Sequence, residues 1–456
     1  MEIDVDAATL ELITNYNYKV ALVSTGPQLN VFPAYEAGST YLTDTNTANH
    51  QYVGGSVVCD VSCYYVPADP PSPYGIAQDL NNLTITNLQN YFLFEGKSAG
   101  TGQLRVEIRN PVGMAVSNDT AKIEIKDIKS MYQRVVATID TSIPNNTIGS
   151  WTLVPGFVPS PDETAHYIVH VHGWNNSVWQ KTCYAETMFK RLYWQGYNGR
   201  FVAFQWPTYT TSWLLPPSAG HYNKSEYQAF KSGEVLADYL DQIYQFSPGI
   251  AVHLCAHSQG NIVVGEALTL AAPGRATHYV LTEAAVPAHC YDVDPTGVLD
   301  FGEFTQKELE DPTPDTYRGS FTSIETVLGK KAVNFYNPLD PAFTVWFRLN
   351  QLNFKPDRPT YYYDMGRAYY SPSMPDREVT DPFELMSHVA RPRSHAIAVT
   401  PGMVGVVEEG LNLHNNETLN FGSQIIDHSG QCNYDFIRTI PFYHELMRQF
   451  ELGPRL

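Results

Sequence analysis

From Trp151 onward, short apolar stretches suited to β-strands alternate with longer stretches in which apolar residues recur at helical spacing. Strands that alternate with helices in this way form parallel sheets, because each helix returns the chain to the start of the next strand. We expect strands at Tyr167–His172, Arg200–Trp206, Ile250–Ala256, Tyr279–Ala285 and Ala332–Tyr336, and helices at Trp179–Trp194, Ser225–Phe246, Asn261–Ala271 and Tyr434–Phe450. The predicted fold class is therefore α/β, with a mostly parallel sheet and helices on both of its faces.

The first 150 residues have a different rhythm. Short stretches rich in Val, Ile, Tyr and Thr are separated by turn clusters such as Pro70–Pro73, a spacing typical of a β-sandwich or partial barrel. These stretches are Lys19–Ser24, Ser56–Val66, Leu83–Phe94, Gln103–Arg109 and Ala121–Ile125. The composition turns polar at Ser142–Asn146. A length of 456 residues favours two domains, so we predict a smaller all-β domain at 1–150 and an α/β domain at 151–456.

Composition limits the partners of the chain. Its 47 acidic and 29 basic side chains give a net charge of −18 without any Lys/Arg run, so a nucleic-acid backbone would be repelled. No apolar stretch is long enough to span a bilayer, and no Cys/His spacing is typical of zinc. The start at Met1–Asp6 has neither the basic nor the apolar region of a signal peptide. The protein is therefore either cytosolic or, as we favour, a segment of a longer exported precursor.

The stretch Ala256–Gly260 places small residues two positions before and after Ser258. An apolar strand-like stretch ends at this point and a helical stretch begins. A nucleophile on a sharp strand-to-helix turn needs small neighbours, because the turn brings backbone and side chains into near contact. Alanine at the first of these positions is a variant of the usual glycine. We predict that Ser258 is a nucleophile, and the alternative is a serine that only caps the helix.

The stretch His170–Asn175 contains the expected oxyanion loop. Acyl transfer needs two backbone N–H groups aimed at the developing oxyanion, one from the residue after the nucleophile and one from a loop after an earlier strand. The residue after the nucleophile is Gln259. For the second donor we expect Trp174, which follows Gly173 at the end of an earlier strand. The alternative is an ordinary strand-to-helix turn that happens to contain a glycine.

A serine hydroxyl needs a histidine to take its proton and a carboxylate to hold that histidine. Asp340 is the expected acid, because it follows a strand-like stretch that runs into a proline-containing turn. A carboxylate just beyond the carboxyl end of a strand projects onto the same edge of the sheet as the serine. An aspartate that only supports an Asx-turn is the alternative role for Asp340. Asp292, which follows the preceding strand, is the reserve acid.

Two histidines compete as the base. His428 lies in a turn just before the last predicted helix, whereas His395 lies in a proline-rich stretch with no closing helix behind it. We predict His428 for that reason. His257 adjoins the serine in sequence, but it should point away from the hydroxyl and is expected to be structural. His172 is expected to brace the oxyanion loop.

With these residues in place, the chain from about Trp151 to its end resembles an α/β hydrolase of the esterase/lipase kind. Two local runs, Glu186–Trp194 and Asn334–Asp340, are similar to uncharacterised hydrolase modules in large exported bacterial proteins. The resemblance implies an α/β-hydrolase fold, a Ser258, Asp340 and His428 triad, and an oxyanion hole at Gln259 and Trp174. It implies an extracellular or cell-envelope location but says little about substrate, and it does not cover the first 150 residues.

Two further stretches have open interpretations. Asp292–Glu303 has the oxygen-bearing residues, the glycine and the final glutamate of a calcium-binding loop, but flanking helices are missing, so an acidic surface loop is the alternative. Tyr209–Tyr222 contains the apolar run Trp213–Pro217. This segment is either a lid or pocket wall at the site, or a surface that packs against another domain.

The predicted function is the hydrolysis of carboxylic esters through an acyl-enzyme, without a cofactor or a catalytic metal. The substrate would be a small-molecule, lipid or polymer ester. Two other classes of function stay open: a non-catalytic binding module on the same fold, and an acyltransferase or peptidase that uses the same triad. The N-terminal domain would bind a surface, a polymer or a partner, or would stabilise the enzyme.

Overall fold

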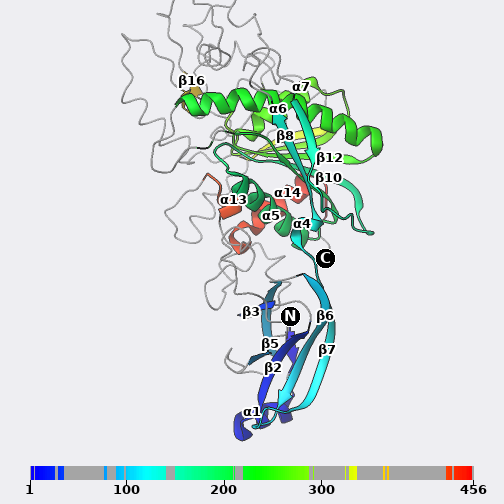
Figure 1. Ribbon diagram of the computed structural model, residues 1–456, viewed down its shortest axis with the longest axis vertical. Helices are drawn as coiled ribbons and strands as arrows, with labels where there is room; N and C mark the ends of the chain where they lie inside the picture. Colours follow the sequence, from blue (N-terminus) through cyan, green and yellow to red (C-terminus); the bar gives the residue numbers. More distant parts are fainter. Residues whose placement is uncertain are drawn as a thin grey trace, which may run out of the picture. The chain divides into compact units, whose positions relative to one another are not determined.

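A computed structural model describes residues 2–4, 6–25, 29–34, 77–79, 89–96, 99–139, 149–208, 210, 219–286, 291, 324, 328–335, 363–364, 367–368, 428–433 and 436–453. Figure 1 shows the helices and strands formed by these residues. The chain divides into two compact units. One comprises Met1–Met131, Glu186–Gln195 and Gln431–His444, and the other comprises Tyr132–Ala185, Gly196–Gly430 and Glu445–Leu456.

The N-terminal region forms two antiparallel sheets, in the orders β1-β5-β3 and β4-β2-β6-β7. Their strands are β1 (Glu2–Asp4), β2 (Lys19–Thr25), β3 (Leu29–Ala34), β4 (Ala77–Asp79), β5 (Gln89–Gly96), β6 (Gly100–Arg109) and β7 (Ala115–Ile125). The predicted β character of this region is confirmed. It also contains a helix that we did not predict, α1 (Ala7–Tyr16), where Thr9 N donates to the capping Asp6 carboxylate at 2.6 Å.

The larger unit contains a seven-stranded sheet in the order β14-β13-β12-β10-β11-β8-β9. Its strands are β8 (Gln133–Ile139), β9 (Gly149–Leu153), β10 (Thr164–Val171), β11 (Gly199–Gln205), β12 (Ala251–His257), β13 (Ala276–Thr282) and β14 (Leu328–Phe335). Neighbouring strands run parallel except for β8 and β9. Helices α6 (Ala219–Phe246) and α7 (Gly260–Leu270) belong wholly to this unit, whereas α5 (Val178–Trp194) and α14 (Phe436–Gln449) each belong to it only in part. The predicted α/β fold class is confirmed.

The strand order changes direction at β10. The chain goes from β10 to β11 on one side, and α6 then carries it back across to β12 on the other side. In open parallel sheets, the crevice beyond the carboxyl ends of the two strands at such a reversal is where ligands bind. The loops after β10 and after β12 therefore border the expected binding crevice.

One face of the sheet is apolar. Paired residues of parallel strands share a face, and so do alternate residues of one strand. On this face Val169 and Val171 of β10 and Leu254 of β12 pack in one buried cluster with apolar side chains of α6 and α7. Figure 1 shows these two helices running along the sheet. Burial of this cluster is the main stabilising contribution, since apolar area removed from water drives folding.

The opposite face is lined by histidines. His166 and His170 of β10, His253 and His257 of β12, and His278 of β13 all lie on it, as the strand registers require. His166 Nδ1 lies 3.2 Å from His253 Nε2, and His253 Nδ1 lies 3.0 Å from His278 Nδ1. His166, His253 and His278 thus form a chain of ring-nitrogen contacts across the three strands.

The seven-stranded sheet begins before the boundary that we expected at residue 150. Its strands β8 and β9 lie at Gln133–Ile139 and Gly149–Leu153 and pair antiparallel at its edge. The polar stretch Ser142–Asn146, which we interpreted as a linker between domains, falls in sequence between these two paired strands. Polar turn residues occur both in linkers and in the connections within a sheet, so composition did not separate the two cases.

Candidate active site

Ser258 stands at the turn between β12 and α7 with a backbone φ of 52°, in the left-handed region that side-chain-bearing residues seldom adopt. Hydrogen bonds from both of its backbone groups hold this conformation. Ser258 N donates to Thr282 O at 3.0 Å, and Ser258 O accepts from Ala285 N at 3.1 Å. Strained backbone that is held by its surroundings is typical of functional positions. The predicted strand-to-helix turn is therefore present.

The small neighbours of Ser258 are needed because the backbone of β10 passes close by. A Cβ on Gly260 would lie 2.5 Å from His172 O and 2.7 Å from Val171 O, both of them backbone atoms. Ala256 is fully buried and lies opposite Val171 in the parallel ladder. A larger side chain at either position would push the turn away from β10. The small residues that predicted the nucleophile thus have a direct steric cause.

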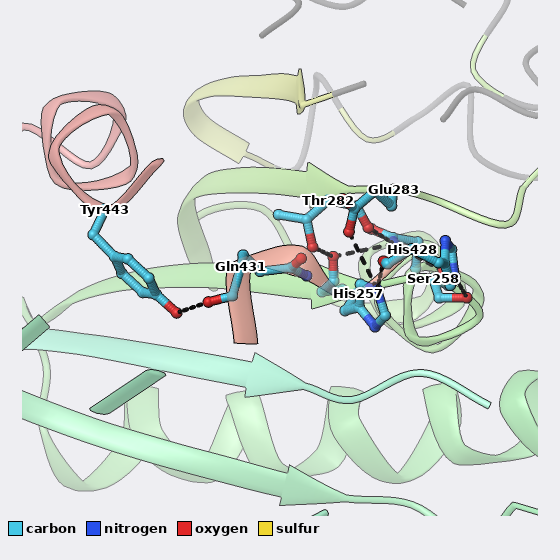
Figure 2. Close-up of polar contacts among 9 residues, drawn as sticks. His257, Ser258, Thr282, Glu283, His428, Gln431 and Tyr443 are labelled. Carbon is cyan, nitrogen blue, oxygen red and sulfur yellow. Dashed lines mark hydrogen bonds and ion pairs between the residues drawn. The ribbon is translucent and has the colours of Figure 1, made fainter. Parts of the chain in front are cut away.

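His428 lies beside the serine. Its Nε2 is 2.8 Å from Ser258 Oγ, and Figure 2 shows the two side chains meeting. For the serine hydroxyl to donate, Nε2 must be the unprotonated nitrogen, so the other ring nitrogen carries the proton in the neutral ring. This is the geometry of a base that can remove the Ser258 proton. The rival histidine, His395, lies outside the described residues.

The loop after β10 approaches the serine so closely that it requires glycine. A Cβ on Gly173 would lie 2.9 Å from Ser258 Cβ and 3.0 Å from His257 Nδ1. The next residue, Trp174, is partly buried. Across the site, Gln259 is fully buried at the N-terminus of α7. Gln259 thus directly follows Ser258, and Trp174 directly follows Gly173, whose backbone approaches Ser258.

The direction of the Trp174 N–H is fixed by its own peptide group. The Gly173 carbonyl oxygen accepts from His172 Nδ1 at 2.8 Å and from Asn176 Nδ2 at 3.0 Å. The C=O and N–H of a trans peptide point in opposite directions, so these bonds also aim the Trp174 N–H away from His172 and Asn176. A fixed backbone N–H needs no reorganisation when charge develops beside it.

His172 is held as a neutral donor. Its Nδ1 must carry the proton that reaches the Gly173 carbonyl, because a carbonyl only accepts. Its Nε2 accepts from Trp206 N at 3.2 Å, and its ring stacks on the Trp206 indole with centroids 5.4 Å apart. Burial lowers the pKa of His172 well below its ordinary range, and the charge of Lys181 lowers it further. The expected brace of the oxyanion loop is therefore an imidazole that stays uncharged at physiological pH.

Both predicted acids lie outside the described residues. In sequence, Asp340 follows β14 and Asp292 follows β13. The possible calcium loop Asp292–Glu303 also lies outside the described residues. The apolar run Trp213–Pro217 also lies outside them. The structure therefore brings together Ser258 and His428 and leaves the position of the acid as a prediction.

The structure contains one buried carboxylate at the site that sequence reasoning missed. Glu283 follows β13 directly and is 3% exposed, and one of its oxygens lies 3.3 Å from His257 Nε2. Its position in the sequence could have indicated it, because Glu283 stands at the carboxyl end of β13, the strand beside β12, which leads to Ser258. The two expected acids, Asp340 and Asp292, lie further along the chain.

Comparison with protein-family models gives a match over residues 158–280, to a family described as "Alpha/beta hydrolase of unknown function (DUF900)". The matched stretch contains β10, β11, β12 and most of β13, together with Ser258 and the loop after β10. The chain has an α/β-hydrolase fold. The family match ends within β13 and does not reach His428. A comparison with curated proteins finds no match.

Solved structures also resemble the chain at low sequence identity. The mature lipase BlEst2 of Bacillus licheniformis is 16% identical, the match covers 64% of this hydrolase chain and 94% of the lipase, and the TM-score is 0.27. The acylaminoacyl peptidase of Pyrococcus horikoshii is 11% identical, with 78% of this chain and 48% of the peptidase covered and a TM-score of 0.29. The chain thus spans nearly all of the lipase but about half of the peptidase.

Some other kinds of site can be assessed over the described part of the hydrolase. Within it, no group of three or more His, Cys, Asp or Glu side chains is arranged to hold a metal ion. No helix in the same residues has the length and apolar character needed to cross a membrane. Cys255 on β12 is a buried free thiol, and burial raises its pKa, which keeps it protonated and unreactive.

Proposed function

We propose that this α/β hydrolase cleaves carboxylic esters, with Ser258 as the nucleophile and His428 as the general base. One observation carries the proposal: His428 Nε2 lies 2.8 Å from Ser258 Oγ, where the serine occupies a strained strand-to-helix turn. A serine that only capped a helix would need neither the left-handed backbone nor a histidine at its hydroxyl. The match to an α/β-hydrolase family over residues 158–280, which include Ser258, supports hydrolysis in general.

In the proposed reaction, Ser258 Oγ attacks the ester carbonyl carbon while its proton passes to His428 Nε2. The carbonyl oxygen becomes an oxyanion that accepts hydrogen bonds from the backbone N–H groups of Gln259 and Trp174. The intermediate then expels the alcohol, which takes the proton from His428 and leaves an acyl group on the serine. Water, deprotonated by the same histidine, releases the acid and restores the enzyme.

Asp340 remains our proposed acid, which would hold the protonated His428 after the proton transfer. The support for Asp340 is its position in sequence after β14, the strand next to β13 in the sheet. One other part of the proposal rests on the sequence, namely an extracellular or cell-envelope location. For the oxyanion hole, the loss of one hydrogen-bond donor usually lowers kcat about 10²–10³-fold.

The test is a series of p-nitrophenyl esters of increasing acyl length, hydrolysed by the full chain and by Ser258→Ala. The proposal expects saturable hydrolysis by the wild type and a loss of several orders of magnitude in the variant. Aminopeptide substrates and acyl acceptors, assayed alongside the esters, separate the rival activities. Preference for an amide, or transfer to an added alcohol in place of water, would change the reaction class. Activity that survived in Ser258→Ala would remove the nucleophile.

A further inference from the structure

The residue that follows β13 is a buried carboxylate in an unusual conformation. Glu283 has a backbone φ of 44° and is 3% exposed. Its N–H donates to Phe335 O at 3.1 Å at the end of β14, and two residues later Ala285 N donates to Ser258 O, also at 3.1 Å. The segment is therefore bonded on one side to the next strand and on the other to the nucleophile turn. A charged side chain is costly to bury unless a partner compensates it.

His257, the residue before the nucleophile, lies beside the Glu283 carboxylate. A Glu283 carboxylate oxygen lies 3.3 Å from His257 Nε2. The same His257 nitrogen lies 2.8 Å from the backbone carbonyl oxygen of His428. A carbonyl can only accept, so His257 Nε2 carries a proton that it directs to His428 O, while the Glu283 carboxylate stands beside the same nitrogen as a neighbouring negative charge. Figure 2 shows this group of side chains beside Ser258.

His257 also supports His428 through its ring. The centroids of the two imidazoles are 4.9 Å apart, with the ring planes tilted by 45°. His428 is thus held at its backbone by a hydrogen bond and at its side chain by a ring contact, and both come from His257. His428 also contacts Ser258 Oγ through its Nε2. Together these contacts place the base relative to the nucleophile.

We propose that Glu283 and His257 are positioning residues that hold His428 in reach of the Ser258 hydroxyl. Glu283 orients the His257 ring and favours its Nε2–H form, and that N–H fixes the backbone of His428. The inference rests on the proposed function and adds to it a pair of residues that neither touches the substrate nor exchanges the proton. Its physical basis is that a displacement of about 1 Å in a catalytic group can lower the rate about 10²-fold.

The decisive comparison is between two substitutions of His257 in the full chain. His257→Gln places an amide N–H near the position of Nε2 and can keep the bond to His428 O, whereas His257→Leu removes it. We expect His257→Leu to lower kcat for the best p-nitrophenyl ester by about 10–100-fold with little change in KM, since the base is misplaced and substrate binding is not. His257→Gln should recover kcat to within about fivefold of the wild type.

A matched control applies the same substitution on the same face of the sheet. His278→Leu removes a buried histidine of β13 at a position remote from Ser258, where its ring contacts His253. It should lower thermal stability and leave kcat unchanged. Equal losses of kcat in His257→Leu and His278→Leu would show a general effect of unfolding and overturn the proposal. Full activity in a folded His257→Leu, or failure of the folded His257→Gln to recover activity, would also overturn it.

The carboxylate is tested by Glu283→Gln and Glu283→Asp. We expect Glu283→Gln to lose about 10-fold in kcat and the charged Glu283→Asp to retain more of it. A loss in Glu283→Gln as severe as in Ser258→Ala would make Glu283 the acid of the triad and overturn the positioning role.

A readout that needs no turnover separates this inference from the proposed function. The ¹⁵N chemical shift of His428 Nε2 reports its hydrogen bond to Ser258 Oγ in the resting protein. That shift should change in His257→Leu and be kept in His257→Gln and His278→Leu. If the wild type hydrolyses no ester but the shifts follow this pattern, the proposed function fails and the positioning holds. If the wild type is active but the shift is the same in all three variants, the positioning fails alone.

Discussion

Lowering the pH from 7.5 to 5.5 should reduce the free energy of unfolding of the wild-type protein by about 1.4 kcal/mol more than that of a His170→Leu variant. His170 lies on the histidine-lined face of the sheet, where it is 3% exposed and its ring stacks on Phe201. Burial, together with a smaller contribution from the nearby charge of His257, lowers the pKa of His170 to about 3. The folded protein therefore keeps this imidazole neutral.

The magnitude follows from the difference between the folded and unfolded states. The unfolded chain binds a proton at His170 near its ordinary pKa of 6.5, while the folded protein does so only near 3. Between these values the unfolded state holds more protons, so stability is fully present above pH 6.5 and is lost as the pH falls. At pH 5.5 the loss is RT ln 11, about 1.4 kcal/mol, and at pH 7.5 it is about 0.1 kcal/mol.

The assay is urea unfolding at the two pH values, followed by tryptophan fluorescence. All seven tryptophans lie at or beyond residue 151, so this signal does not report on the N-terminal region. Phe201→Leu is the matched control, because it removes the same ring stack without a titratable group and should leave the pH dependence at the wild-type value. Other buried histidines contribute equally to both proteins and cancel in the comparison. An identical pH dependence in wild type and His170→Leu would refute the reasoning.

Three further outcomes are expected. Gly173→Ala should lower kcat about 100-fold by displacing the Ser258 turn, and kcat above a tenth of the wild type would contradict the close approach. Asp340→Asn should lower kcat about 10⁴-fold while Asp292→Asn stays within about threefold, and the reverse result would move the acid. A chelator should lower the melting temperature, with recovery on adding calcium, if Asp292–Glu303 binds the ion; an unchanged melting temperature would leave an acidic surface loop.

The sequence predicted the five strands from β10 to β14, because each is a continuous apolar stretch, but it did not predict β8 and β9 as part of this sheet. The predicted strand Ile250–Ala256 and helix Asn261–Ala271 match β12 and α7 to within one residue at each end. The small residues around Ser258 predicted the turn because sterics leave few alternatives there. His428 was preferred over His395 because it lies in a turn just before the last predicted helix, and its Nε2 lies at the Ser258 hydroxyl.

What the sequence could not show is which polar groups meet in space. Nothing in Thr282–Ala284 distinguishes Glu283 from a surface glutamate, since its burial depends on the packing of β13 between β12 and β14. The expected structural role of His257 did not reveal that its nitrogen binds the backbone of His428, which is 171 residues away. Helix α1 was missed because it is short and lies among strand-like stretches.

The most direct test of the account is a covalent one. The full chain is treated with a fluorophosphonate, and the modified residue is identified by peptide mass spectrometry in the wild type, Ser258→Ala and His428→Ala. The account predicts one phosphonyl group on Ser258 in the wild type, none in Ser258→Ala, and a rate lower by about three orders of magnitude or more in His428→Ala, since the hydroxyl then lacks its base. Modification at another residue, or an undiminished rate in His428→Ala, would contradict the claim that His428 activates Ser258.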